Sequence, residues 1–194
     1  MDVTPTTLTG RIVRLEPLTL DHAPGLLACA TPDLFDLSPQ KPDAWTEAGF
    51  RAELARVLDL PDVIAFAIIH RETNAPIGRT AYMDIRPAHR GLEIGRTWIA
   101  KPFQGTRVNP ETKFLMLRHA FDVLGAIRVQ LKTDARNLQS QRAIAKLGAR
   151  REGVLRRHMI LPDGTLRDTV LFSITDDEWP GVRETLVARL GYEP

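Results

Sequence analysis

A short polar loop and the helix expected after it carry the first residues that could do chemistry. Residues 103–113 read FQGTRVNPETK, so Gly105 and Arg107 precede Asn109 and Pro110. Asparagine is a favoured N-cap, and proline suits the first helical position because its missing N–H would be unpaired there anyway. A helix N-terminus offers free N–H groups and about half a positive charge, which can hold a phosphate. An ordinary capped helix explains the same residues, and the Gly-Lys-Ser/Thr ending of a Walker motif is missing.

A second polar group follows a predicted strand. Asn137 and Ser140 stand three residues apart at the start of residues 138–149, which are expected to form a helix. This spacing places both side chains on one side of the helix start, beside the end of the strand. Turn and cap roles are the simpler explanation of the pair, because both side chains bond readily to nearby backbone groups. From these residues alone, both interpretations stay open.

The hydrophobic pattern predicts the elements that must position these residues. Apolar residues at helical spacing indicate helices, and alternating or β-branched runs indicate strands. The expected helices are 20–30, 44–60, 111–126, 138–149 and 175–190. The expected strands are 10–18, 63–70, 77–85, 92–100, 127–135, 153–161 and 166–174. In the second helix Trp45, Ala48, Ala52, Ala55 and Leu58 stand at helical spacing and are expected to face the core, with Phe50 and Leu54 on the flank. Thr46 or Asp43 is the expected first cap.

The connections between the strands predict how they pair. Short, turn-rich segments join 63–70, 77–85 and 92–100, which indicates an antiparallel meander. An Asp-Gly pair at 163–164 predicts a hairpin between the last two strands, and Glu178 three residues after Thr175 resembles a capping box. We therefore expect one α+β domain over residues 1–194, with a mixed, mostly antiparallel twisted sheet flanked by helices.

The composition narrows the classes of function. The net charge of +2 gives no electrostatic reason for a nucleic-acid partner or a membrane surface. The N-terminus has no signal-peptide pattern, and no run approaches the roughly 20 apolar residues of a membrane span, so a cytoplasmic location is expected. The single cysteine, Cys29, rules out an internal disulfide and reads as a small buried hydrophobe. No metal is expected either, because the five histidines lack metal-ligand spacing.

Both polar groups together resemble a known family. The segments GRIVRLEPL, LEIGRTWIAKPFQGT, RHAFDVLGAIRVQLKTDARNLQSQRAIAKLGARREGVLR and DGTLRDTVLFSITDDEW are similar to the GNAT superfamily of acyl-CoA-dependent N-acetyltransferases. The likeness covers nearly the whole chain and is greatest for the branch that acetylates ribosomal-protein N-termini. Its most specific part is the strand, Asn-x-x-Ser, helix and Lys-Leu-Gly-Ala series. The resemblance implies a splayed strand pair that forms an acyl-CoA cleft, with acetyl-CoA as co-substrate and an amine as acceptor.

The resemblance also implies roles for single residues. Ile99 and Ala100 would pair with pantetheine through their backbone, and Asn137 would bond to pantetheine through its side chain. Ser140 would lie near the thioester sulfur, and Arg142 is a candidate partner of the ribose phosphate. The pyrophosphate would be held by the loop residues Gln104, Gly105, Thr106, Arg107, Val108 and Asn109.

The sequence departs from the family pattern at the loop and at the expected acid. The family loop reads Gln/Arg-x-x-Gly-x-Gly/Ala; Gln104 fits, but Arg107 and Asn109 stand at the two small-residue positions. The Arg107 guanidinium and the Asn109 amide would then contact the pyrophosphate and partly replace the backbone contacts that small residues allow. Many members have a tyrosine seven residues after the asparagine, where this chain has Ile144. Ser140 is the expected substitute as proton donor to the departing thiolate.

The general base is less clearly indicated. Glu93 matches an acidic position that part of the family uses, but it could equally be a strand carboxylate paired with Arg79 or Arg96. The absence of a strong acid–base pair slightly favours a less basic amine such as an α-amine, with a pKa of about 8 against about 10.4 for lysine. The competing hypothesis is a non-catalytic acyl-CoA-binding or interaction module. The residues do not fix the oligomeric state, and a homodimer is one option.

Overall fold

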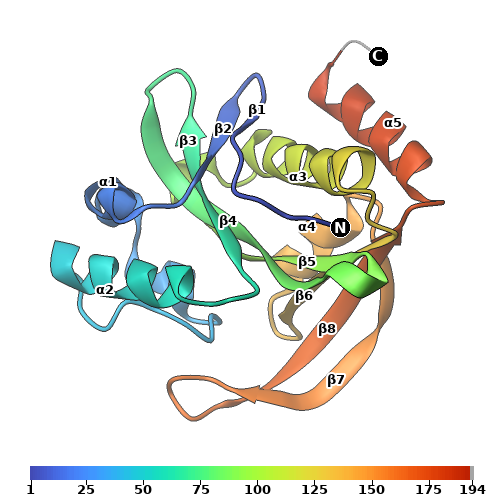
Figure 1. Ribbon diagram of the computed structural model, residues 1–194. Helices are drawn as coiled ribbons and strands as arrows, with labels where there is room; N and C mark the ends of the chain where they lie inside the picture. The colour runs from blue at the N-terminus through green and yellow to red at the C-terminus, as the bar shows by residue number, and fades with distance from the viewer. Residues whose placement is uncertain (193–194) are drawn as a thin grey trace.

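The computed structural model describes residues 1–192, which are organised around one continuous sheet (Figure 1). Its eight strands are β1 (Leu8–Thr9), β2 (Val13–Pro17), β3 (Ile64–His70), β4 (Ala75–Arg86), β5 (Gly91–Ile99), β6 (Arg128–Asp134), β7 (Arg150–Ile160) and β8 (Leu166–Thr175). Their spatial order is β1-β2-β3-β4-β5-β6-β8-β7. Every neighbouring pair is antiparallel except β5 and β6, which are parallel. The predicted meander, the hairpin and the mixed α+β fold are confirmed.

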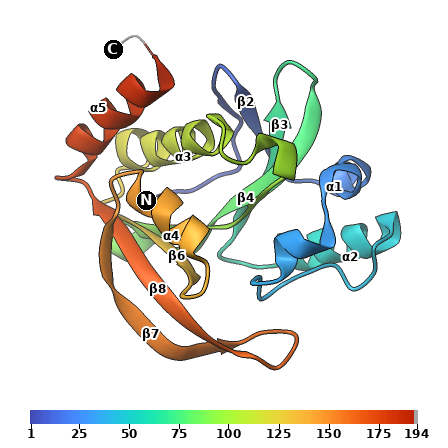
Figure 2. The same ribbon diagram turned by 180° about the vertical axis from the view of Figure 1, so that it is seen from behind.

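Helices cover both faces of this sheet (Figure 2). The α-helices are α1 (Ala23–Cys29), α2 (Glu47–Leu58), α3 (Val108–Arg118), α4 (Leu138–Ala145) and α5 (Trp179–Leu190). A π-helical turn, His119–Val123, continues α3, and short 3-10 turns lie at Leu20–His22, Pro32–Phe35, Pro87–His89 and Lys101–Phe103. Helices α1 and α2 lie side by side, well apart from α3 and α5. Within residues 1–192, no helix is long and apolar enough to cross a membrane.

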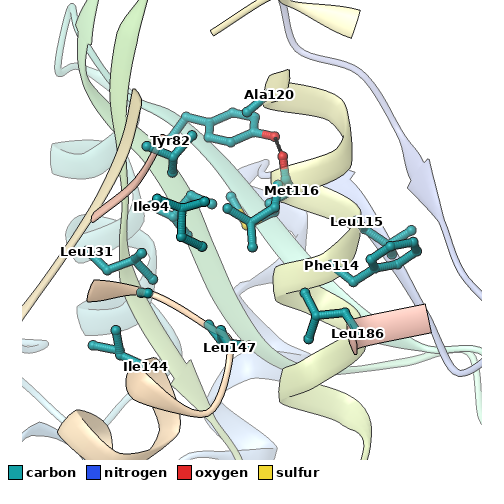
Figure 3. Close-up of a cluster of buried hydrophobic side chains, with 14 of the residues drawn as sticks. Tyr82, Ile94, Phe114, Leu115, Met116, Ala120, Leu131, Ile144, Leu147 and Leu186 are labelled. Atoms are coloured by element: carbon teal, nitrogen blue, oxygen red, sulfur yellow. Dashed lines mark hydrogen bonds between the residues drawn. The ribbon is translucent and has the colours of Figure 1, made fainter. Parts of the chain in front are cut away.

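The sheet separates two hydrophobic cores. The larger core lies on the side of α3, where Tyr82 and Ile94 of the sheet meet Met116 of α3 and Ile144 of α4 (Figure 3). The hydroxyl of Tyr82 donates a hydrogen bond to the carbonyl of Met116 at 2.6 Å, so this buried phenol is fully used in packing. Each fully buried large side chain contributes roughly 1.5–3 kcal/mol. The smaller core joins α1 and α2 to the opposite face and includes Phe50, Leu54 and Trp98.

Helix α2 confirms the predicted cap but not the predicted face. The Thr46 hydroxyl accepts from the N–H of Gly49 at 3.2 Å, as an N-cap does. Trp45 and Leu58, which were expected to be buried, are 39% and 42% exposed. The buried face contains Phe50, Leu54 and Val57 together with Glu53. The prediction was wrong because Phe50 and Leu54 bury more apolar area than the alanine stripe, and because Glu53 forms a buried ion pair with Arg79.

The first turn of α3 ties this helix to the N-terminal strands. The carboxylate of Glu111, which is completely buried, accepts from the N–H groups of Arg11, Ile12 and Val13 at 2.6–2.9 Å. The hydroxyl of Tyr192 donates to the same carboxylate. Charge-assisted bonds of this kind are among the stronger contacts in proteins. They hold α3, and therefore the loop before it, in a fixed position over the sheet.

Helix α5 begins later than its sequence pattern suggested. Thr175 was expected to open the helix, but the first helical residue is Trp179 and Thr175 ends β8. One of the two hydrogen bonds of the expected capping box is still present, because the Glu178 carboxylate accepts from the N–H of Thr175 at 3.0 Å. The intervening residues form a turn between strand and helix instead of the first helical turn.

Candidate active site

Strands β5 and β6 part from one another partway along their length. They pair only at Gly91–Glu93 with Arg128–Gln130, although β5 continues to Ile99 and β6 to Asp134. Beyond these residues, β5 and β6 form no further strand pairing in the described part of the chain. The expected splay is thereby confirmed. An unpaired strand edge presents N–H and C=O groups that can bind an extended ligand in the manner of another strand.

A bulge distorts β5 beside this opening. Ala81 pairs with Gly95 and Arg79 with Trp98, so two residues of β5, Arg96 and Thr97, oppose one residue of β4. Arg96 has φ +51°, a conformation that residues with a side chain adopt rarely. Bulges bend a strand and redirect its side chains, and backbone strain of this kind gathers at functional sites. The site therefore has a shaped wall as well as an open edge.

The loop before α3 differs in detail from its prediction. The helix begins at Val108, so Asn109 is its second residue and Pro110 its third; Asn109 is not the N-cap. The hydroxyl of Thr106 accepts from the N–H of Val108 at 3.2 Å and donates to the carbonyl of Phe103 at 2.7 Å. Arg107 occupies the N-cap position without a side-chain cap bond, and the Thr106 hydroxyl, one residue earlier, bonds to the first helical N–H instead. Proline is tolerated at the third position, since the first four N–H groups of a helix have no partner inside it.

Gly105 makes this loop open and unusually shaped. Its φ is +74°, which glycine adopts readily and other residues rarely do, and no heavy atom lies within 4 Å of the place a Cβ would occupy. The flanking side chains Gln104, Thr106 and Arg107 are all exposed. A bulky anion could therefore approach this loop closely. Its positive charge comes from the Arg107 guanidinium and from the helix N-terminus that follows.

The loop is also attached to the end of β5. The side-chain amide of Gln104 donates to the carbonyl of Ile99 at 2.9 Å. Ala100 donates its N–H to the carbonyl of Ile77 at 2.8 Å, and its carbonyl accepts from Phe103 at 2.9 Å. Three of the four backbone groups predicted to pair with pantetheine are thus engaged within the protein. The N–H of Ile99 is the fourth, and the predicted role rests mainly on it.

The Asn-x-x-Ser pair forms the start of α4. Asn137 is the N-cap, and its Oδ1 accepts from the N–H of Ser140 at 2.9 Å. Both side chains are half-buried, whereas Arg142 on the next turn is exposed. Ile144, at the position where many relatives have a tyrosine, is 7% exposed and packs in the larger core with Leu147 (Figure 3). The position of the missing acid is thus filled by a core side chain.

Glu93 lies where the strands begin to part, and its partner is not an arginine. Its carboxylate accepts from the ammonium of Lys132 on β6 at 2.7 Å and from the amide of Gln130 at 3.2 Å. The expected alternative of an Arg79 or Arg96 partner was wrong, because β6 places a lysine opposite while Arg79 is bonded to Glu53 at 2.6 Å. Glu93 is 4% exposed, so a substrate amine cannot contact its carboxylate directly, and a proton would have to reach it through water.

Lys113 is a polar residue beside the opening that the sequence reading missed. Its ammonium donates to the hydroxyl of Thr97, at the bulge, at 2.5 Å and to that of Thr80 at 3.3 Å. Burial lowers the pKa of Lys113 to about 7. Its spacing from Met116 and Leu117, three and four residues on, could have revealed a lysine on the buried face of α3.

A depression lies on the side of the sheet covered by α2. Its volume is about 350 Å³, and it separates the segment 32–45 from the turn of the β7–β8 hairpin. Aromatic and acidic side chains line it together, among them Phe35, Trp45, Asp36, Asp43 and Asp163. Such a depression could admit an amine substrate. Within residues 1–192, no group of three or more His, Cys, Asp or Glu side chains is placed to hold a metal ion.

Comparison with known proteins agrees with this geometry. The model of the acetyltransferase (GNAT) domain matches residues 13–150, and the chain belongs to this family. A crystal structure of a proposed acetyltransferase from T. thermophilus is 46% identical, with a TM-score of 0.92, and the match covers 98% of this chain and 100% of that one. A GCN5-related N-acetyltransferase from Brucella melitensis is 34% identical, with a TM-score of 0.91 and coverage of 97% and 86%.

Two further relatives add detail. The uncharacterized N-acetyltransferase YoaA of Bacillus subtilis (strain 168) is 31% identical over 111 residues. The match takes in 57% of this chain and spans 62% of the length of that relative. Mycobacterium smegmatis RimJ, solved in complex with CoA-disulfide, is 23% identical with a TM-score of 0.80 over 95% of each chain, a likeness that shows the fold alone.

Proposed function

We propose that this protein is an N-acetyltransferase that moves an acetyl group from acetyl-CoA to a primary amine by direct attack in a ternary complex. The acceptor would be a protein or peptide N-terminus or a small amine. The observation that carries the proposal is the splay of β5 and β6 directly beside the open, cationic loop at the start of α3. Family membership and the 46% and 34% identical relatives support the same activity.

The residues present fit acetyl-CoA, which supplies the activated acyl group as its thioester. The unpaired edge of β5, ending at Ile99, suits an extended pantetheine chain. The loop Gln104–Asn109 suits a pyrophosphate, because Gly105 leaves its surface open and Arg107 adds a full charge. The side-chain NH₂ of Asn137 remains a donor after Oδ1 caps the helix. Arg142 is exposed and is therefore available to bind the ribose phosphate of CoA.

Proton transfer at this site depends on few groups. The hydroxyl of Ser140, or solvent, would protonate the departing sulfur. The acceptor amine must lose a proton. Glu93 is buried and paired with Lys132, so it could take this proton only through a water molecule. A base that acts only through water suits an amine that is partly neutral at pH 7, so an α-amine is favoured over a lysine side chain.

A non-catalytic acyl-CoA-binding module is the second candidate. It is favoured by the buried Ile144 at the expected acid position and by Arg107 and Asn109 in place of small residues. Turnover distinguishes the two candidates. Thiol release from acetyl-CoA is measured with peptides, amino acids and polyamines, and products are identified by mass spectrometry. Amine-stimulated release supports the enzyme, whereas tight CoA binding without release supports the module. Calorimetry that detects no acetyl-CoA binding at high micromolar concentration would refute both.

A further inference from the structure

Unpaired polar atoms gather at one place on the α2 side of the sheet. Of the nine buried side-chain N and O atoms that lack a hydrogen-bond partner among residues 1–192, five belong to Arg79, Arg96 and Trp98. Arg79 on β4 pairs with Trp98 on β5 in register, and Arg96 stands two residues before Trp98 at the bulge. Most buried polar groups in proteins are hydrogen-bonded, so a concentration of this kind requires a physical explanation.

Arg79 is held by one carboxylate and keeps two donors spare. The side chain is 3% exposed, and its Nη2 donates to Oε1 of Glu53, itself 3% exposed, at 2.6 Å. Its Nε and Nη1 are buried, and no acceptor for them exists in the described part of the chain. A guanidinium usually pairs with a carboxylate through two parallel bonds. Here one edge of the fork is used and the other is left for another acceptor.

Arg96 adds a charge that no carboxylate neutralises by contact. Its Nε and Nη1 are also buried without an acceptor among the described residues. Burial first, and repulsion from Arg79 second, lower the pKa of Arg96, whereas Glu53, Asp62 and Glu93 attract it without contact. Glu53 is already bonded to Arg79, and Glu93 to Lys132. Asp62 is exposed and forms no ion pair with Arg96 in the described residues, so this guanidinium has no carboxylate in contact beside the acyl cleft.

The indole of Trp98 packs against a side chain that lines a depression in the surface. The rings of Trp98 and Phe35 lie 5.5 Å apart, and Phe35 lines the depression between residues 32–45 and the hairpin turn. The bulge that contains Arg96 borders the splay of β5 and β6. Glu53 belongs to α2, whereas the cationic loop 104–109 leads into α3 on the opposite face. These donors therefore lie on the α2 face of the sheet, away from the loop expected to hold the CoA phosphates, and an acceptor that enters from this face could meet them.

We infer that Arg79, Arg96 and the indole N–H of Trp98 bind a carboxylate of the acceptor, so that the acetylated amine belongs to a molecule with a carboxylate group. This inference rests on the proposed function. A carboxylate fits because its two oxygens match the planar fork of a guanidinium, and its single charge matches the one guanidinium that has no carboxylate in contact. A phosphate dianion would bring a second negative charge that the site does not balance.

Matched acceptors test the inference. Acetyl transfer is measured for ω-amino acids of increasing chain length and their primary amides, and for peptides that differ only by Asp or Asn near the N-terminus. For at least one pair, the carboxylated member should have the higher kcat/KM by about tenfold or more, the value of a charge-assisted bond. Arg96→Gln should remove that preference, so that the carboxylated member loses more kcat/KM than its amide. Arg189→Gln is the control, since Arg189 is exposed on α5 and bonds to the carbonyl of Lys146.

The outcomes separate the two proposals. Equal use of acid and amide by the wild type, or an Arg96→Gln loss that is the same for both, overturns the inference and upholds acetyl transfer. No transfer to any acceptor counts against the proposed function. Calorimetry with N-acetylated ω-amino acids and their amides then tests the carboxylate site without turnover, and equal or absent binding overturns it. Should Arg96→Gln not fold, Trp98→Phe keeps the ring contact with Phe35, loses the indole donor, and should weaken only the carboxylated members.

Discussion

Oδ1 of Asn137 accepts a hydrogen bond from the backbone N–H of Ser140 at 2.9 Å, which fixes both residues at the start of α4. The bond uses one end of the asparagine amide and the main chain of the serine. The NH₂ group of Asn137 and the hydroxyl of Ser140 have no part in it. Capping and ligand binding are therefore compatible here, and substitutions that remove one atom at a time can separate them.

Two substitutions of Asn137 should divide its cap from its proposed ligand contact. Asn137→Ala removes both functions, so it should lower the free energy of unfolding by about 1 kcal/mol and raise KM for acetyl-CoA. Asn137→Asp keeps an oxygen that can cap the helix but loses the NH₂ donor. It should unfold like the wild type in urea and still show the raised KM. An aspartate variant with an unchanged KM would leave Asn137 as a cap only.

Ser140→Ala tests proton transfer to the departing sulfur. The alanine keeps the N–H that bonds to Asn137, so the helix start and the stability should be preserved. If the hydroxyl acts as the sulfur gains charge, kcat should fall while KM for acetyl-CoA stays constant. A serine is a poor acid and a thiolate leaves readily, so the loss should be at most about a hundredfold, the lower edge of general-acid effects. Unchanged turnover across the pH range would assign this step to solvent.

Arg107→Ala tests the cationic loop. Arg107 is exposed and its side chain does not cap α3, so folding should be unaffected. A phosphate contact contributes roughly 1.5–3 kcal/mol, so CoA should bind about tenfold more weakly or worse, while pantetheine, which lacks the phosphates, should bind as before. Arg118→Ala is a matched control, because Arg118 is exposed at the other end of the same helix. Equal weakening for both ligands would remove Arg107 from the phosphate site.

Local patterns predicted most of the fold because each element carries its own signal. Strand β2 alternates between apolar and polar residues, so that Val13 and Leu15 are buried and Arg14 is not. The Asp-Gly pair at 163–164 lies in the turn that joins β7 and β8. The splay of β5 and β6 followed from the resemblance alone. No local pattern states where two parallel strands stop pairing, because that depends on which side chains meet across them.

One error occurred where tertiary contacts outweigh local preference. Thr46 capped α2 as predicted, but the buried face was set by packing and by the ion pair of Glu53 with Arg79, 26 residues further on. The start of α3 was missed for a local reason: the helix begins at Val108, whose N–H bonds to the Thr106 hydroxyl, so Asn109 lies inside the helix and cannot be its cap. A distant pairing such as that of Glu53 with Arg79 leaves no periodic trace in the sequence.

The buried ammonium of Lys113 should make stability depend on pH. Burial lowers its pKa from 10.5 to about 7, and the described residues that it contacts are the neutral hydroxyls of Thr97 and Thr80. The unfolded chain then binds more protons than the native chain between pH 7 and 10.5, so stability should rise with pH there, by at most about 1.4 kcal/mol per unit. The pKa of Cys29, raised by burial from 9.0 to about 11, acts in the opposite direction above pH 9.

Urea unfolding between pH 7 and 9 therefore isolates this effect, with Lys113→Met as the comparison. Methionine fills a similar volume without charge, and Thr80 and Thr97 can remain bonded to each other, since their hydroxyls lie 2.8 Å apart. The wild type should gain roughly 2 kcal/mol across this interval and the variant much less, because the slope of a single site is bounded by one proton. The variant should also be the more stable protein at pH 7, where the native state otherwise buries a charge that is half present. If the free energy of unfolding changed with pH in the same way for both proteins, the pKa of Lys113 would not be lowered by burial and the prediction would be wrong.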